Sequence, residues 1–177
     1  MAGIVIAAVL WWSDFVSRIL DPYIVILNSV PKVALGPIFI VWLGTGLKAV
    51  VAMAIATSII VTIMVVHNGF KNIDPNKIKL MRTFGASRLQ IFTKVVIPAS
   101  VPTMIAALKV SVGLSLVGTI VGEFLGSKAG LGYLIVYGGQ IFNMSLVMAA
   151  VVMLSVVSAL LYYLVALLER KVVRFNH

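Results

Sequence analysis

The sequence predicts an all-α protein whose helices form a polytopic bundle across a membrane, and three observations carry this prediction. Hydrophobic residues make up 62% of the 177 residues and charged residues only 11%, against roughly 45–50% and about 25% in soluble domains. Four apolar stretches are each long enough to cross a bilayer, which takes about 20 helical residues. The basic residues are concentrated in short segments between these stretches. We therefore expect lipid to surround most of the chain.

The four expected spans cover residues 23–43, 47–66, 101–125 and 141–168. Pro31 and Pro37 remove backbone donors from the first span, which predicts a kink. A fifth apolar segment, residues 2–12, reaches only about 16 Å as a helix and is too short to cross. We interpret it as the inner end of a span whose beginning is absent. The chain is then one domain, residues 1–177, with about four full spans and a truncated N-terminal one.

The distribution of basic residues predicts which loops face the cytoplasm. Six of the 14 Lys and Arg residues fall in one central insert, and three more fall in the last eight residues. Loops that remain in the cytoplasm keep such residues. The central insert, the C-terminal tail and an expected turn at residues 13–21 are therefore placed inside, and residues 44–46 and 127–140 outside. The net charge of +9 is explained by this topology, so no nucleic-acid partner is expected.

The central insert predicts two short helices joined by a sharp corner. Asp74 and Pro75 are typical of a helix start, because Asp caps free donors and Pro has the φ of a first turn. Gly85 is the usual residue of a left-handed helix end. Ser87 and Gln90 have the spacing of a capping box, which starts a second helix expected to stop at Pro98. Ile78, Met81 and Phe84 are expected to share a rough face of the first helix.

Small and ionisable residues in the third span suggest packing and a pathway. Gly118, Gly122 and Gly126 recur every four residues, a spacing that lets membrane helices approach closely; packing within one subunit and a dimer seam both remain open. Lys109 and Glu123 lie on nearly one face but about 21 Å apart along the axis, too far to pair with each other. They are candidates for lining a pathway or gate. The alternatives are a snorkelling Lys109 and an interfacial Glu123.

Catalytic and metal chemistry find little support in the sequence. The chain has no cysteine, which excludes disulfides and thiolate metal sites. It also has only five acidic residues. His67 and His177 are far apart in sequence, and His67 at the end of a span is expected to be interfacial. We expect no catalytic residues, no metal and no cofactor.

Two segments of the insert resemble the cytoplasmic signature loop of bacterial ABC importer permeases. The family pattern is Glu-Ala-Ala, three residues, Gly, nine residues, then Ile-x-Leu-Pro. Gly85 and Pro98 match it, and Val95 and Ile97 are conservative replacements. Lys79, Leu80 and Met81 replace Glu-Ala-Ala. Further motifs in order along the chain are similar to the nitrate, sulfonate and taurine branch: Asp21-Pro22, Val30-Pro31, Gly36-Pro37, Trp42-Leu43-Gly44, Val121-Gly122-Glu123-Phe124, Gly130-Leu131-Gly132-Tyr133-Leu134 and Leu168-Glu169-Arg170.

This resemblance implies a type I importer permease in the bacterial plasma membrane. The permease would be a non-catalytic subunit, and a partner chain would hydrolyse the ATP that drives transport. It implies that a loop at about residues 68–99 couples the permease to cytoplasmic ABC ATPase subunits. The implied coupling residues are Lys79, Arg82, Thr83, Phe84, Gly85, Ala86, Ser87, Arg88 and Pro98. Other implied partners are an extracytoplasmic substrate-binding protein and a second permease copy, in a homodimer. The implied substrate is a small solute such as a sulfonate, taurine, nitrate or a thiamine-precursor pyrimidine.

Two other classes of function remain as alternatives. A membrane channel or a structural membrane protein could carry a basic loop that lies on anionic lipid. A membrane enzyme would need convergent acids, histidines or a nucleophile. The defined corner of the insert favours docking to a protein over either alternative.

Overall fold

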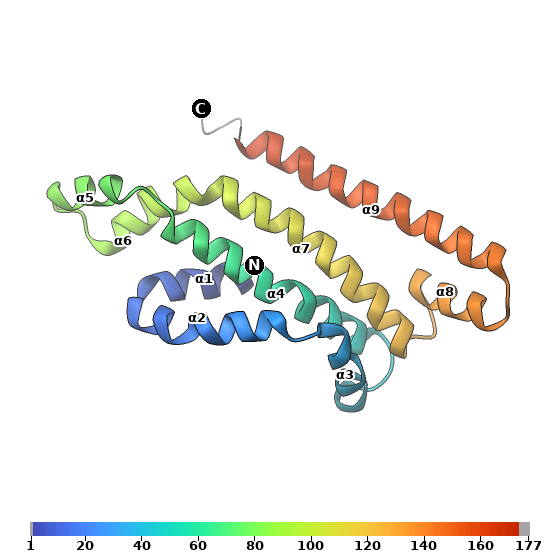
Figure 1. The fold of residues 1–177 in the computed structure, drawn as a ribbon. Coiled ribbons are helices and arrows are strands. Elements are labelled where there is room, and N and C mark those ends of the chain that lie inside the picture. Colours follow the sequence, from blue (N-terminus) through green and yellow to red (C-terminus); the bar gives the residue numbers. More distant parts are fainter. Residues whose placement is uncertain (1, 174–177) are drawn as a thin grey trace.

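Two long helices on either side of the insert, α4 (Leu47–Lys71) and α7 (Ile97–Gly126), form the centre of the fold. The computed structural model describes residues 2–173 (Figure 1). α4 and α7 share the most extensive interface of the described elements, because small residues of α7 line it. A Cβ on Gly118 would lie 2.7 Å from the carbonyl oxygen of Met53, and one on Gly122 would lie 2.8 Å from Cα of Val50. Packing within one chain is thus confirmed as a role of these glycines.

The chain begins with a hairpin of two helices, α1 (Ala2–Trp12) and α2 (Asp14–Ser29), both of which contact α4. The short helix expected over residues 2–12 is confirmed. The turn expected at residues 13–21 is wrong. Ser13 caps a new helix at once, since its hydroxyl accepts a hydrogen bond from the backbone N–H of Val16 at 3.3 Å. Figure 1 shows α1 and α2 side by side, next to α4.

The first predicted span is broken rather than merely kinked. α2 ends at Ser29, a 3₁₀ turn (Lys32–Leu35) follows, and α3 (Gly36–Leu43) leaves at an angle of 85°. Pro31 lies between the two helices in extended backbone, as a residue without a backbone donor favours. The next turn is anchored at the same end of the bundle, because Gly46 N–H donates to the carbonyl of Gly126 at 2.7 Å.

The helix that follows the corner does not stop at Pro98, so that prediction is wrong. α6 (Arg88–Ile91), a π turn (Phe92–Val96) and α7 form one helical run from Arg88 to Gly126. Pro98 lies just after the π turn, and the extra residue of that turn accommodates a proline ring that would clash inside a regular α-helix.

The last two helices are α8 (Leu131–Gln140) and α9 (Met144–Val173), and α8 lies in a segment that we expected to be a loop. α9 starts later than predicted. Phe142 has φ 55°, and the side chain of Asn143 accepts from Leu146 N–H at 3.1 Å. Within residues 2–173, three helices are long and apolar enough to cross a membrane, or four if the bent pair α2–α3 counts as one span. The predicted all-α membrane bundle is confirmed.

Candidate functional site

The insert between α4 and α7 forms a helix–corner–helix whose ends are capped as predicted. α5 (Pro75–Thr83) starts at Asp74, whose carboxylate accepts from Asn76 N–H at 2.8 Å. After it the chain turns at Gly85, which has φ 75°. Ala86 N–H there donates back to the carbonyl of Met81 at 3.0 Å. Such a left-handed turn favours glycine because it has no Cβ.

The second arm of the corner is fixed by a reciprocal pair of hydrogen bonds. The Ser87 hydroxyl accepts from Gln90 N–H at 3.3 Å, and the Gln90 side chain accepts from Ser87 N–H at 2.8 Å. This is the predicted capping box. Both arms therefore meet at a defined angle, and the insert has fixed geometry at the corner.

The insert has one apolar face that packs inward and one that is exposed. Ile78, Met81 and Ile91 pack against a core that contains Phe70 of α4. Phe84 is 76% exposed. We expected Phe84 to share a face with Ile78 and Met81, and it does not. The helix ends at Thr83, so the backbone of Phe84 no longer follows the helical repeat that places Ile78 and Met81 on one face.

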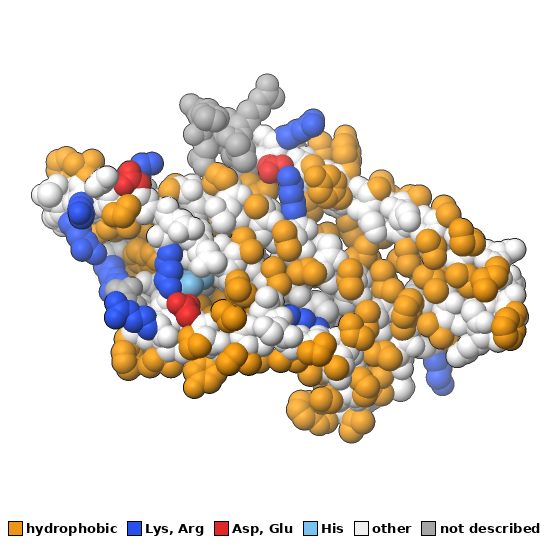
Figure 2. Space-filling view, viewed as in Figure 1, with side chains coloured by type: hydrophobic (Ala, Val, Ile, Leu, Met, Phe, Trp, Pro, Cys, Tyr) orange, Lys and Arg blue, Asp and Glu red, His pale blue; other side chains and the backbone are white. Residues whose placement is uncertain are grey.

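Basic side chains lie beside the exposed apolar ones. Figure 2 shows Lys and Arg gathered over the end of the molecule that carries α5 and α6, while hydrophobic side chains dominate the rest of that view. The exposed basic residues of this end, which we call the basic end, are Lys71, Lys77, Lys79, Arg82, Arg88 and Lys94. Exposed apolar side chains next to polar and charged ones are typical of a surface that docks a protein.

Arg88 connects the corner to the end of α1, a contact that the sequence did not reveal. Its guanidinium lies 5.6 Å from the ring centroid of Trp11 and 5.8 Å from that of Trp12. One of its N–H groups also reaches the Trp11 carbonyl, at 3.5 Å. Phe92 extends this cluster, with its ring centroid 4.8 Å from that of Trp11 and 5.7 Å from that of Phe70. A signal existed in the Trp-Trp pair, which we had assigned only to a short apolar helix.

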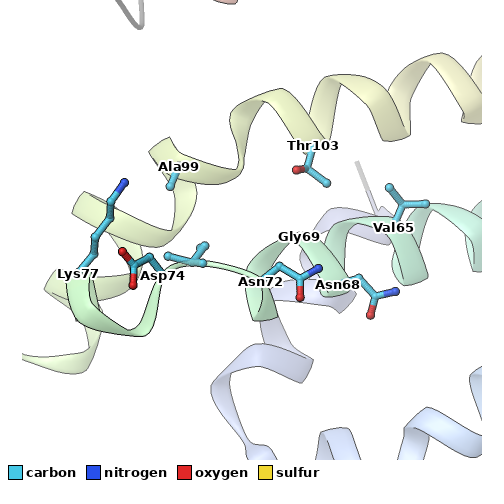
Figure 3. Close-up of a pocket in the computed structure, with 9 residues that line it drawn as sticks. Val65, Asn68, Gly69, Asn72, Asp74, Lys77, Ala99 and Thr103 are labelled. Carbon is cyan, nitrogen blue, oxygen red and sulfur yellow. The ribbon is translucent and has the colours of Figure 1, made fainter. Parts of the chain in front are cut away.

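A polar cavity of about 490 Å³ lies at the base of the insert, where α4 and α7 diverge. Figure 3 shows its labelled walls: Val65, Asn68 and Gly69 on α4, Asn72 just after it, Asp74 and Lys77 at α5, and Ala99 and Thr103 on α7. The two long helices are still in close contact at the inner wall of this cavity, because a Cβ on Gly69 would lie 2.6 Å from the Thr103 methyl carbon. The insert thus bridges two helices that are tightly packed up to its base.

Lys109 pairs with a residue far along the chain. Its ammonium lies 2.5 Å from a carboxylate oxygen of Glu169, and 5.8 Å from the ring centroid of Tyr162. Both partners of the ion pair are partly buried, at 24% and 36% side-chain exposure. The pair joins α7 to α9, so this charge is neutralised within the described part of the chain instead of snorkelling alone.

Glu123 lies against the start of α8. Its carboxylate accepts from Gly132 N–H at 2.6 Å. A Cβ on Gly130 would lie 2.2 Å from the carboxyl carbon of Glu123. A negative group at a helix N-terminus satisfies free donors and opposes the positive end of the helix dipole. Glu123 therefore holds α8 against α7.

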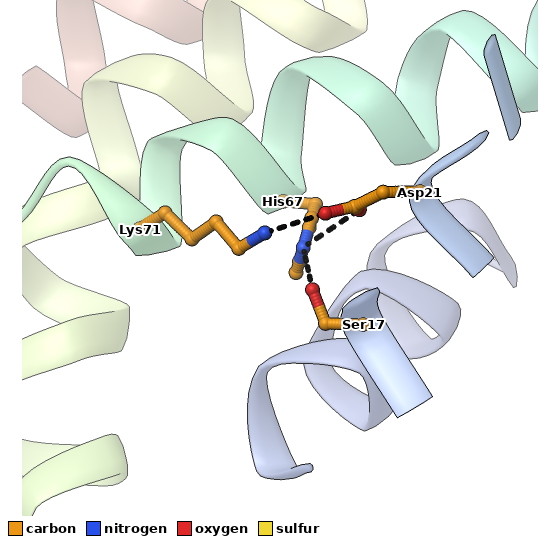
Figure 4. Close-up of polar contacts among 4 residues, drawn as sticks. All are labelled: Ser17, Asp21, His67 and Lys71. Atoms are coloured by element: carbon orange, nitrogen blue, oxygen red, sulfur yellow. Dashed lines mark hydrogen bonds and ion pairs between the residues drawn. The ribbon is translucent and has the colours of Figure 1, made fainter. Parts of the chain in front are cut away.

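His67 is buried between α2 and α4, and its expected position at the membrane interface stays a prediction. It is 3% exposed, and its Nε2 lies 2.9 Å from the Ser17 hydroxyl. Asp21 of α2 lies beside it, with a carboxylate oxygen 3.6 Å from Nε2 and the other 2.8 Å from the ammonium of Lys71. Figure 4 shows these four side chains between α2 and α4. This polar group fastens the first hairpin to α4 at the basic end.

The helix order, the capped corner and the match to known proteins together define the class. Residues 1–174 match the family model described as "Binding-protein-dependent transport system inner membrane component". The chain belongs to this family, the type I permeases of ABC importers, and is a multi-pass inner-membrane protein.

Individual relatives agree with this family. A probable ABC transporter permease of Haemophilus influenzae is 30% identical over 161 residues, which is 91% of this chain and 66% of that protein. A formylaminopyrimidine transport permease of Halalkalibacterium halodurans is 30% identical, over 74% of this chain and 52% of the relative. A putative aliphatic sulfonates transport permease of Bacillus subtilis is 27% identical, over 99% and 63%. The chain thus spans 52–66% of the length of these relatives.

A solved structure has the same fold. A chain of the MetNI methionine ABC transporter in an inward-facing conformation superposes with a TM-score of 0.80 at 22% identity, over 99% of this chain and 86% of that one.

Proposed function

We propose that this chain is the membrane-spanning subunit of an ATP-driven importer, with the corner around Gly85 as the docking surface of a separate ABC ATPase. The observation that carries the proposal is the exposed, rigid corner. Phe84 is 76% exposed at its tip, and both arms are capped. Its docking residues are Lys79, Arg82, Thr83, Phe84, Gly85, Ala86 and Ser87, with Pro98 at the base in a loop of about residues 68–99. Arg88, which the resemblance also implied, lies instead against Trp11 and Trp12 of the same chain.

In this proposal, ATP binding moves the ATPase subunits, and the corner transmits that motion to the membrane helices. ATP bound to the ATPase thus shifts the membrane helices of the permease between two conformations. Two copies of the permease enclose the pathway, and a substrate-binding protein delivers the solute from outside. We propose that Lys109 and Glu123 act at the pathway as gate residues, since they hold α9 and α8 against α7. The relatives named for sulfonates, taurine, nitrate and formylaminopyrimidine support a small solute of that kind.

Substitution of Gly85 tests the docking proposal. No atom lies within 4 Å of a Cβ built at Gly85, so a substitution there acts through backbone conformation alone. Gly85→Val should abolish co-purification of the ATPase while leaving membrane insertion intact, because a β-branched residue resists positive φ. Gly85→Asn is the matched control and should retain co-purification, because Asn tolerates this conformation.

Normal co-purification with Gly85→Val would contradict docking at the corner. Uptake by proteoliposomes that contain the permease, the ATPase and the binding protein identifies the solute among the four classes above. Solute flux that needs no ATP would instead support the channel alternative.

A further inference from the structure

The corner is connected to the membrane helices through its two covalent arms, through the inward-packing apolar face of the insert, and through Arg88. We infer that Arg88 is a positioning residue for coupling, which makes the α1–α2 hairpin move together with the corner. This inference rests on the proposed docking of an ATPase at that corner. It concerns a residue that faces the permease itself and not the docking partner.

The backbone of Arg88 is fixed relative to the corner. Arg88 is the first residue of α6, directly after the capping-box residue Ser87. Gly85, with φ 75°, sets the direction of the chain three residues earlier. Any displacement of the corner therefore displaces the base of the Arg88 side chain by the same amount.

The other end of this contact is the last turn of α1. The carbonyl groups of a final helical turn lack partners within the helix and form the negative end of its dipole. The Arg88 guanidinium reaches one of them, that of Trp11, at 3.5 Å. It also lies within 6 Å of two indole rings, the arrangement in which a planar cation is attracted to an aromatic face. Three interactions thus join one side chain to one helix end.

The covalent route to α7 contains an irregular turn. It passes through the π turn at Phe92–Val96, and single π turns inside α-helices are rare and frequently lie at functional sites. The contact of Arg88 with α1 bypasses this turn.

A displacement of α1 can pass along the chain to α2. α1 continues into α2 through Ser13 alone. α2 is joined to α4 by the Ser17–His67 hydrogen bond and the Asp21–Lys71 ion pair. At its other end α2 meets the 85° break. A displacement carried by Arg88 therefore reaches the broken span, where the direction of the chain already changes.

The first experiment measures solute uptake per ATP hydrolysed in proteoliposomes containing the whole transporter. Arg88→Ala should keep ATPase co-purification and a hydrolysis rate within about twofold, while uptake per ATP falls about tenfold. Arg88→Lys should be intermediate, because Lys keeps the charge but not the planar stacking. Lys94→Ala, an equal charge change at an exposed position of the same insert, should match the wild type.

The second experiment reports motion, which a purely structural role of Arg88 would not affect. The chain has no cysteine, so Phe15→Cys on α2 and Asn76→Cys on α5, both exposed, can carry spin labels. With Arg88 present, the distance between the labels should stay the same in nucleotide-free and ATP-bound transporters. With Arg88→Ala, it should change when ATP binds.

The outcomes separate this inference from the function on which it rests. Absence of the ATPase from the purified wild-type complex would overturn both. Three results would overturn the inference alone: uptake per ATP in Arg88→Ala equal to that of Lys94→Ala, a label distance that stays constant without Arg88, or loss of co-purification for Arg88→Ala. In the last case Arg88 would be a contact of the ATPase. If Arg88→Ala does not fold, Arg88→Lys in the same assays decides.

Discussion

At the scale of single residues, the two charges within the α7 run have partners that no local pattern could reveal. Glu123 accepts from Gly132, nine residues away, and Lys109 pairs with Glu169, sixty residues away. The sequence placed both residues on α7 and on nearly one face of it. It could not show which helices would pack against that face, because pairing at such separations depends on the tertiary fold.

Removal of the Glu123 carboxylate should loosen α8. Glu123→Ala leaves Gly132 N–H without its acceptor, at a cost of about 1–3 kcal/mol, so amides of residues 131–140 should exchange faster with deuterium. Glu123→Gln is the control, since its side-chain carbonyl can accept the same bond and should keep most of the protection. Mass spectrometry of the protein in nanodiscs measures the exchange. Equal protection in the alanine variant and the wild type would show that α8 is held by other contacts.

Charge reversal tests the ion pair between α7 and α9. Lys109→Glu or Glu169→Lys alone places like charges together in a partly buried setting, so each should lower the thermal unfolding midpoint in detergent. The double reversal should recover most of the loss, because the attraction is restored with opposite signs. Two additive losses in the double variant would mean that the pair contributes nothing to stability.

At the scale of helices, close approach of α4 and α7 depends on where α7 lacks side chains. Gly118→Ala should destabilise the protein by about 1–3 kcal/mol through overpacking, because its Cβ would meet the carbonyl of Met53. Gly113 lies on the same helix with nothing within 4 Å of a Cβ. Gly113→Ala should be neutral or stabilising, since Ala is the better helix former. Unfolding midpoints that fall equally in both variants would contradict a steric role for Gly118.

The elements that the sequence predicted correctly are those with local signals. Asp74, Gly85 and Ser87 act on neighbours within a few residues, so the capped corner could be derived from the sequence alone. The angle of the 85° break, the π turn and α8 were missed for a different reason. A proline marks a departure from regular helix without fixing its form: Pro31 breaks the first span instead of kinking it, and Pro98 lies inside a continuous helical run.

At the scale of the molecule, the basic end is where separate elements are joined. The insert spans α4 and α7, the Arg88 cluster adds α1, and the His67 group adds α2. At the opposite end, α3 projects from the bundle and α8 lies between α7 and α9 (Figure 1). These contacts join four helices at the end where a cytoplasmic partner is proposed to bind. Composition and spacing predicted the membrane helices, whereas this concentration of contacts appears only once the chain is folded.

The π turn also fixes the azimuth of the corner about the axis of α7. Each helical residue rotates the chain by about 100°, and a π turn holds one residue more than an α turn. Deleting a single residue between Phe92 and Val96 would convert it to an ordinary turn and swing Arg88 roughly a quarter of a circle away from Trp11. One surplus residue therefore decides which way the tip of this protein points.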